Sequence, residues 1–279
     1  VFSCNGKPPV PVKIARGEDG SVRRTSRTEQ GLSVEEAWTP QPEKDYGFRY
    51  TVGIRNDGKD PLKATATVNL GTVPLPASTS MFSSNADLAE IDALSVGGKE
   101  PELRTFDQSK ILKDKAGTAD GESFRWAAIH SKYFIFYLEA LGDHRIAKVY
   151  GKHFSDGGAP QASGHLELQT EMLAPGASKE WDFNAYVGPK EYQRMADLGE
   201  QTVKVLRMDL FFFWHAGWMG ALSRWVLIAL VKLNGWIGGP WGYGIGIVLI
   251  TFAIKVLFWP LSHKGSVSMF KLQQVQPKI

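Results

Sequence analysis

Residues 236–261, WIGGPWGYGIGIVLITFAIKVLFWPL, limit the fold of this chain more than any other segment because they are almost entirely apolar. No charged side chain occurs between Lys232 and Lys255. A helix needs about 20 mostly apolar residues to cross the ~30 Å hydrocarbon core of a bilayer. Tryptophans near both ends match the aromatic belts found at membrane interfaces. The pattern therefore predicts one transmembrane helix over residues 236–262.

Lys255 is the one charged residue inside this predicted span. Counted at 1.5 Å per residue, it lies roughly 13 Å along the helix axis from Lys264. A lysine in the middle of a transmembrane helix costs about 2.5–3.5 kcal/mol on insertion scales. Two interpretations remain open. Lys255 either faces a water-filled cavity that attracts acidic or polar substrate segments, or its long side chain snorkels to the interface.

Three glycines at four-residue spacing, Gly238, Gly242 and Gly246, are expected to share one helix face and to allow close helix packing. The alternative is that glycine is simply frequent in transmembrane helices. The glycines at 242, 244 and 246 also resemble a nucleotide-binding loop, but no βαβ unit surrounds them, so nucleotide binding is not predicted.

The segment before the span, residues 210–234, is rich in tryptophan and phenylalanine but is interrupted by charged side chains. It could be a second transmembrane helix that tolerates Arg224. An aromatic-rich helix with basic residues can instead lie in the headgroup region. The longest uninterrupted apolar run covers only residues 225–231, which favours an interfacial helix within a linker region at 208–235. The expected interfacial residues are Trp218, Arg224, Trp225 and Lys232.

Residues 1–207 predict a mainly β domain. Short alternating apolar runs are separated by Gly- and Pro-containing connectors, which favours an antiparallel sandwich over βαβ units. Two of these runs, residues 48–55 and 62–70, flank an Asn-Asp-Gly turn and are predicted to pair as a hairpin. Further strands are predicted over residues 10–15, 21–26, 124–129, 133–138, 145–150, 165–172 and 181–187.

Three segments of this domain do not follow the strand pattern. Residues 86–91 predict a short helix, and residues 107–121 predict a polar loop. Residues 190–208 are polar and helix-prone, with Gly199 as a point where the helix can break. Pro189 fits the first turn of that helix, where a missing N–H costs nothing.

Composition and motifs exclude several functions. The net charge of +3, without a basic run interleaved with aromatics, argues against nucleic-acid binding. The single cysteine, Cys4, excludes a disulfide framework and a cysteine-rich metal site. The six histidines lack the spacing of a helical metal pair, and nucleophile-elbow, P-loop and CxxC motifs are absent. We therefore expect a protein that is not an enzyme, without catalytic residues, cofactor or metal.

The charges after the span predict its orientation. His263, Lys264, Lys271 and Lys278 follow it, and no acidic residue occurs from Val256 onward. The positive-inside rule places this end in the cytoplasm, and therefore the β domain in the periplasm of a Gram-negative envelope. The chain starts with valine and ends inside a helical pattern, which predicts that it is a fragment.

Several motifs, in the same order, resemble the YidC/Oxa1/Alb3 family of membrane protein insertases. FRWAAIHSKYFIFYLEAL (residues 124–141) and YVGPKEYQRMADLG (186–199) resemble parts of the family's periplasmic domain. Residues 222–261 resemble its amphipathic helix, its turn and a span ending in T-x-x-x-[RK]-x-x-x-x-P-L. Residues 268–278 resemble the start of its cytoplasmic helical hairpin, assigned here to 263–279.

The resemblance implies a β-supersandwich periplasmic domain, an interfacial amphipathic helix and one transmembrane helix. It implies an insertase of the bacterial inner membrane that assists insertion and folding of membrane proteins, alone or with the Sec translocon. The implied partners are nascent membrane proteins, the lipid bilayer and Sec translocon components. Lys255 matches the positive residue of the family's hydrophilic groove, which is usually arginine; lysine keeps the charge but loses the bidentate fork.

A second class of function stays open, a membrane-tethered periplasmic module that binds carbohydrate or protein. An open cleft lined by aromatic side chains would favour it. Trp126, Tyr133 and Phe134 could line such a cleft, but their apolar alternation favours the core. The resemblance does not extend to the family's N-terminal anchor or later transmembrane helices, so we expect that this chain cannot form the groove alone.

Overall fold

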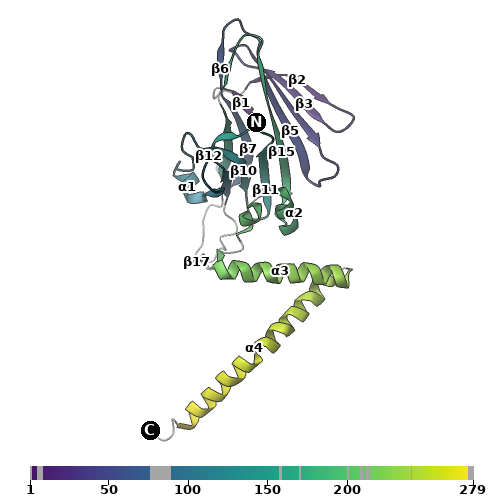
Figure 1. Cartoon of the computed structure of the whole chain (residues 1–279), viewed down its shortest axis with the longest axis vertical. Helices are drawn as coiled ribbons and strands as arrows, with labels where there is room; N and C mark the ends of the chain where they lie inside the picture. The colour runs from purple at the N-terminus through teal and green to yellow at the C-terminus, as the bar shows by residue number, and fades with distance from the viewer. Residues whose placement is uncertain are drawn as a thin grey trace. The chain divides into compact units, whose positions relative to one another are not determined.

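A computed structural model describes residues 2–4, 9–75, 89–156, 159–169, 171–199, 201–207, 210–211, 214–215, 217–239 and 241–275 (Figure 1). The chain divides into two compact units, Val1–Leu206 and Arg207–Ile279. The first is a β domain and the second contains two long helices. The predicted mainly β fold followed by helices is therefore confirmed.

In the described part of the β domain, one large antiparallel sheet has the order β1-β7-β13-β12-β10-β11-β15-β5-β4-β3-β2, and β8 joins β10 and carries β9. A small second sheet pairs β14 with β6. The strands are β1 Phe2–Cys4, β2 Val10–Arg16, β3 Val22–Arg27, β4 Leu32–Pro40, β5 Gly47–Asn56, β6 Leu62–Ala64, β7 Ala66–Pro74, β8 Glu90–Ser95, β9 Glu102–Phe106, β10 Phe124–His130, β11 Phe134–Ala140, β12 Ile146–Asp156, β13 Ala159–Leu168, β14 Glu171–Leu173 and β15 Ser178–Pro189.

Two apolar clusters form the core of this domain. The larger cluster includes Phe124, Trp181 and Phe183, all at most 2% exposed, from the alternating positions of β10 and β15. The smaller cluster gathers Trp126 and Tyr137 with Met195 of α2 (Tyr192–Leu198). Because successive strand residues point to opposite faces, the central strands carry apolar side chains on both faces. The helical segment after β15 thus completes the core on one of these faces.

The predicted hairpin is wrong although both of its runs are strands. β5 pairs with β4 and β15, while β6 pairs with β14 and β7 pairs with β1 and β13. Asn56 explains why the chain leaves the sheet at this turn. Its buried side chain donates to the carbonyl oxygens of Asp60 and Leu173 and accepts from the Gly58 N–H, each at 2.9 Å. The second run therefore continues toward β14 instead of folding back on β5.

The other predictions for irregular segments also need correction. Of the predicted helix at 86–91, residues 86–88 lie outside the described residues, and the chain is already in β8 at Glu90. The predicted polar loop contains a helix, α1 (Gln108–Leu112), because the Asp107 carboxylate caps the Lys110 N–H at 2.9 Å. Pro189 ends β15 rather than opening a helix, and α2 stops before Gly199, whose φ is +154°.

The second unit contains α3 (Gly217–Ile237) and α4 (Gly242–Val275), preceded by the short pair β16 (Leu210–Phe211) and β17 (Trp214–His215). The predicted span at 236–262 therefore starts too early, because its first residues still belong to α3. Gly238 and Gly239 adopt φ values of +67° and +70° between the helices. Glycine takes this conformation without steric cost, so the pair ends α3 and turns the chain.

Candidate functional site

The second unit contains the one helical segment, among the described residues, that is long and apolar enough to cross a membrane. It covers Gly242–Pro260 and is mostly exposed, with only 11% of the segment buried. α4 runs without interruption through Lys255, which therefore lies roughly 20 Å along the axis from Gly242. Thr251, one turn earlier, turns its hydroxyl to the Ile247 carbonyl at 2.7 Å. Lys255 thus stays within the apolar segment, as the sequence predicts.

The first turns of α4 pack against the end of α3 through two glycines. A Cβ at Gly246 would lie 3.4 Å from the Leu230 side chain and 3.6 Å from the Leu233 Cβ. A Cβ at Gly242 would overlap the Asn234 Oδ1 and lie 3.3 Å from the Asn234 Cα. A Cβ at Gly242 would therefore collide with Asn234, whereas at Gly246 a Cβ alone fits and only a larger side chain would crowd Leu230 and Leu233. Both glycines suit a close approach of the two helices.

Gly238 does not share this face, so its predicted role in helix packing is wrong. It lies outside α4, in the turn, and its N–H donates to the Asn234 carbonyl at 2.8 Å. The four-residue spacing with Gly242 is irrelevant here, because no helix connects the two positions. Gly238 instead acts as a helix C-terminal cap.

Two basic residues of α3, Arg224 and Lys232, lie on the side that faces away from α4. They are eight residues apart, so they differ by about a quarter of a turn around the helix. Leu230, which contacts α4, lies about 120° around the helix from Arg224 and about 160° from Lys232. Trp225 next to Arg224 is 74% exposed. Trp218 is in the first turn of α3, outside the residues whose side chains the structure describes.

The β domain carries an open cleft of about 570 Å³. Its lining is mainly apolar, and Glu36 lies at its floor with an exposure of 1%. The Glu36 carboxylate accepts a hydrogen bond from the Tyr50 hydroxyl at 3.0 Å and pairs with the Arg24 guanidinium. Burial raises the pKa of the Tyr50 hydroxyl, and the Glu36 charge raises it further. Aromatic rings on the cleft wall are Trp38, Phe48, Tyr50, Phe134 and Phe136.

The three aromatic residues predicted to lie in the core have different positions. Trp126 is fully buried, which confirms the prediction for that residue. Tyr133 and Phe134 are each 63% exposed, so the prediction is wrong for them. They stand where β10 turns into β11, at the end of the strand pair, and their side chains are open to solvent there. Phe134 lines the cleft instead.

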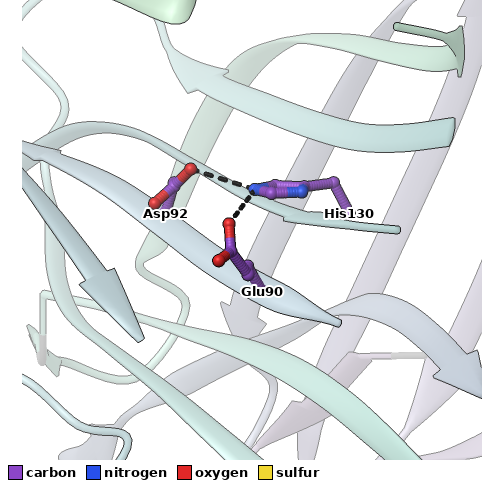
Figure 2. Close-up of side chains that lie close together, drawn as sticks. All are labelled: Glu90, Asp92 and His130. Carbon is purple, nitrogen blue, oxygen red and sulfur yellow. Dashed lines mark hydrogen bonds and ion pairs between the residues drawn. The ribbon is translucent and has the colours of Figure 1, made fainter. Parts of the chain in front are cut away.

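A compact group of ionisable side chains lies on β8 and β10 (Figure 2). Glu90 and Asp92 share one face of β8 because they are two residues apart, and His130 is the register partner of Glu90 on β10. His130 Nε2 lies 2.9 Å from Asp92 Oδ2 and 3.8 Å from Glu90 Oε2. The His130 side chain is 2% exposed, the Asp92 side chain 0% and the Glu90 side chain 13%.

Two more residues contact this group. Thr105 of β9 donates its hydroxyl to Asp92 Oδ1 at 2.6 Å. Lys190 Nζ lies 3.2 Å from His130 Nδ1 and 3.2 Å from the Ser131 carbonyl oxygen. Since an ammonium group can only donate, Nδ1 accepts here, and His130 donates its Nε2–H to Asp92. The group therefore links β8, β9, β10 and the segment that follows β15.

Sequence reasoning missed the group formed by Glu90, Asp92 and His130. The two acidic residues fell within or beside the predicted short helix, and His130 lies 38 residues from Asp92. Only the pairing of β8 with β10 brings them together. A usable signal was the Glu-x-Asp alternation itself, which places two carboxylates on one face of any strand.

The family model and the relatives by sequence point to the same family. The family model of the YidC periplasmic domain matches residues 11–227. A membrane protein insertase YidC from Geobacter sp. (strain M21) is 25% identical over 280 residues, which are 96% of this chain and 45% of that protein. The one from Geotalea daltonii is 24% identical over 100% of this chain and 47% of its own length. The chain therefore spans less than half the length of these relatives.

Among solved structures, the chain is similar to a galactose mutarotase-like protein from Lactobacillus casei ATCC 334. The TM-score is 0.41 and the sequence identity 12%, over 63% of this chain and 72% of that one. A putative aldose 1-epimerase from Escherichia coli K12 has a TM-score of 0.39, with 12% identity over 66% and 69% of the two chains. Likeness at this level has no bearing on function.

Proposed function

We propose, from the premise that this chain belongs to the family of the YidC periplasmic domain, that it is part of a membrane protein insertase. The observation that carries the proposal is the order of its parts. A β domain that matches the family over residues 11–227 is followed by an apolar helix with one lysine inside it. The lysine marks the proposed contact with the substrate.

The geometry of the helical unit supports a location in a membrane. The length of residues 242–260 and their largely apolar, exposed side chains suit a lipid environment. Arg224 and Lys232 lie on the side of α3 opposite its contact with α4, so they can reach headgroups while α4 enters the hydrocarbon core. We place the β domain in the periplasm and the C-terminal end in the cytoplasm, because the charges that follow the span are basic.

The mechanism we infer is electrostatic and needs no nucleotide. Lys255 attracts an acidic or polar part of a nascent membrane protein into the membrane region, where its charge acts at a lower dielectric constant than in water. Transfer of the apolar part of the same segment to lipid then drives insertion, at about 25 cal/mol per Å² of apolar surface. The protein makes and breaks no covalent bond, so it is not an enzyme in this account.

The partners follow from this mechanism. Nascent membrane proteins are the substrates, and Sec translocon components are a further partner for substrates with long translocated parts. Because the chain spans less than half the length of its relatives, we propose that other helices of such an insertase form the remaining walls of the groove. They would also supply the water that makes a lysine tolerable at this depth.

Substitution of Lys255 in the intact protein tests this function. Lys255→Arg, Lys255→Ala and Lys255→Glu are compared for insertion of a substrate with an acidic translocated tail into proteoliposomes. We expect Arg to keep activity, Ala to reduce it and Glu to reduce it most. Equal insertion by the Glu and Lys proteins would overturn the electrostatic role, and unchanged insertion without any of the protein would overturn the insertase function.

The cleft of the β domain favours a second, additional role, the binding of an extended apolar polypeptide. Its rings offer apolar surface, with Phe134 63% exposed. Carbohydrate is a poorer fit because the Trp38 ring already stacks with Tyr50 at 5.4 Å and contacts the Arg24 guanidinium at 5.8 Å. Phe134→Ser should weaken binding of an apolar translocated segment, measured by photocrosslinking, while Tyr133→Ser, outside the cleft lining, should not.

A further inference from the structure

We propose that Glu90, Asp92 and His130 bind a divalent transition-metal ion, with Zn²⁺ as the best match to their chemistry. Figure 2 shows both carboxylates directed at the same edge of the imidazole ring. The three candidate ligand atoms, His130 Nε2, Asp92 Oδ2 and Glu90 Oε2, lie within 4.8 Å of one another. One imidazole and two carboxylates form a nitrogen and oxygen donor set that suits Zn²⁺.

The spacing of these atoms is close to what such an ion requires. Zn–N and Zn–O bonds of about 2.1 Å in a tetrahedron place neighbouring ligand atoms roughly 3.4 Å apart. The Nε2 atom of His130 lies 2.9 Å from one carboxylate oxygen and 3.8 Å from the other. Shifts of about half an ångström would therefore give the bound geometry. Such shifts need side-chain rotation only, with β8 and β10 remaining paired.

The surroundings also resemble those of a metal site. The Thr105 hydroxyl donates to Asp92 Oδ1 and orients the carboxylate so that Oδ2 faces the imidazole. Outer-shell hydrogen bonds of this kind fix metal ligands in place. Glu90, with 13% of its side chain exposed, lies nearest the surface and offers the route by which an ion enters.

A divalent cation bound at His130 Nε2 would lie between the two carboxylates. This nitrogen is 2.9 Å from Asp92 Oδ2 and 3.8 Å from Glu90 Oε2. Carboxylates buried away from water are normally paired with cations or coordinate metals, so a metal ion suits this position.

Lys190 offers a test that distinguishes a metal site from a purely structural cluster, because its removal should change the metal affinity. In the metal-free arrangement its ammonium donates to His130 Nδ1 at 3.2 Å. When a metal takes Nε2, the ring proton moves to Nδ1, which can then no longer accept from Lys190. The ammonium would lose that contact and keep acceptors such as the Ser131 carbonyl oxygen. Lys190 therefore competes with the metal, and removing it should tighten metal binding.

The test is a calorimetric titration with ZnCl₂ of the intact protein in detergent, after EDTA treatment and removal of the chelator. We expect one Zn²⁺ per chain in the wild type. His130→Gln and Asp92→Asn should weaken binding at least ~100-fold, since even outer-shell changes cost 10–100-fold. His153→Gln is the matched control, because His153 pairs with Asp114 on an exposed surface at 3.3 Å and should bind like the wild type.

Two further measurements test metal binding without depending on the folding of the ligand variants. Lys190→Met should bind Zn²⁺ several-fold more tightly than the wild type, and the wild type should show the visible absorption of Co²⁺ held by nitrogen and oxygen ligands. Less than one bound metal per chain in the wild type, or unchanged binding in His130→Gln, would overturn the proposal. Weaker binding in Lys190→Met would overturn it too.

Discussion

Lys255 and Gly246 lie on opposite sides of α4, because Lys255 is nine positions further along the helix, which corresponds to about two and a half turns. The Gly246 side contacts Leu230 and Leu233 of α3. Since α3 occupies that side, it leaves the Lys255 side open. The helix pair thus has one face that holds it together and another that offers a positive charge. Any group that stabilises this charge comes from water, lipid headgroups or another polypeptide segment.

The contact between α3 and α4 predicts that Gly246 and Gly244 differ in how well they tolerate a larger side chain. A valine at Gly246 would crowd Leu230 and should destabilise the helix pair by roughly 1–3 kcal/mol, as overpacking does. Gly244 has open space at its Cβ position, so Gly244→Val should be tolerated. Limited proteolysis in detergent, followed at the turn between α3 and α4, reports the loss of packing. Equal cleavage rates in the two variants would show that the contact is unimportant.

Because the Glu36 carboxylate is buried, removal of its partner Arg24 should strongly destabilise the β domain. Arg24→Met would leave Glu36, 1% exposed, without its guanidinium, which should cost about 3–5 kcal/mol of unfolding free energy. The double variant Arg24→Met/Glu36→Leu should recover most of that loss, because no buried charge remains. Denaturant unfolding followed by tryptophan fluorescence measures these differences.

The adjacent pair on the same two strands is the control. Arg23 and Glu35, 3.1 Å apart, have side chains that are 66% and 54% exposed. Arg23→Met should therefore cost less than about 1 kcal/mol. If Arg23→Met and Arg24→Met destabilised the protein equally, the special role of the buried pair would be disproved.

His165 predicts how the stability of the β domain depends on pH. Burial, together with the charge of Lys152, lowers the pKa of His165 from 6.5 to about 4. Between these values the unfolded chain binds a proton that the folded protein does not bind. Stability should therefore fall as the pH falls from about 6.5 to about 4, and His165→Gln should reduce this slope of the unfolding free energy.

A substitution of Ser163, a neighbour of His165, tests whether the imidazole itself or its hydrogen bond causes this pH dependence of stability. The Ser163 hydroxyl lies 2.9 Å from His165 Nε2. Ser163→Ala removes the hydroxyl but leaves the imidazole buried, so the slope should persist in that variant. An unchanged slope in His165→Gln would mean that other groups cause the acid sensitivity.

Local patterns predicted the strands better than their partners. The alternation in β5 and β15 follows directly from one buried and one less buried face, and both strands are where the sequence places them. Pairing depends on contacts between distant segments. β5 lies between β4 and β15, and nothing in its own residues or in the turn after it indicates that arrangement.

The candidate site residues, like the strands, could be predicted only where local sequence is sufficient. Lys255 was found from the sequence because a charge in an apolar run is unusual wherever the helix lies. Gly238 was misplaced because a four-residue spacing has meaning only inside one helix, and the sequence does not show that α4 begins at Gly242. His130 and Asp92 meet only through the register of β8 and β10, which no local pattern encodes.

An exchange of charge between residue 255 and its substrate shows whether the two attract each other. Two substrates that differ only in an acidic or a basic translocated tail are inserted by the intact protein carrying either Lys255 or Lys255→Glu. We predict a crossed result. The lysine protein should favour the acidic tail, and the glutamate protein should lose that substrate and gain on the basic one. If both substrates instead decline together in the glutamate protein, the charge of Lys255 does not act on the substrate.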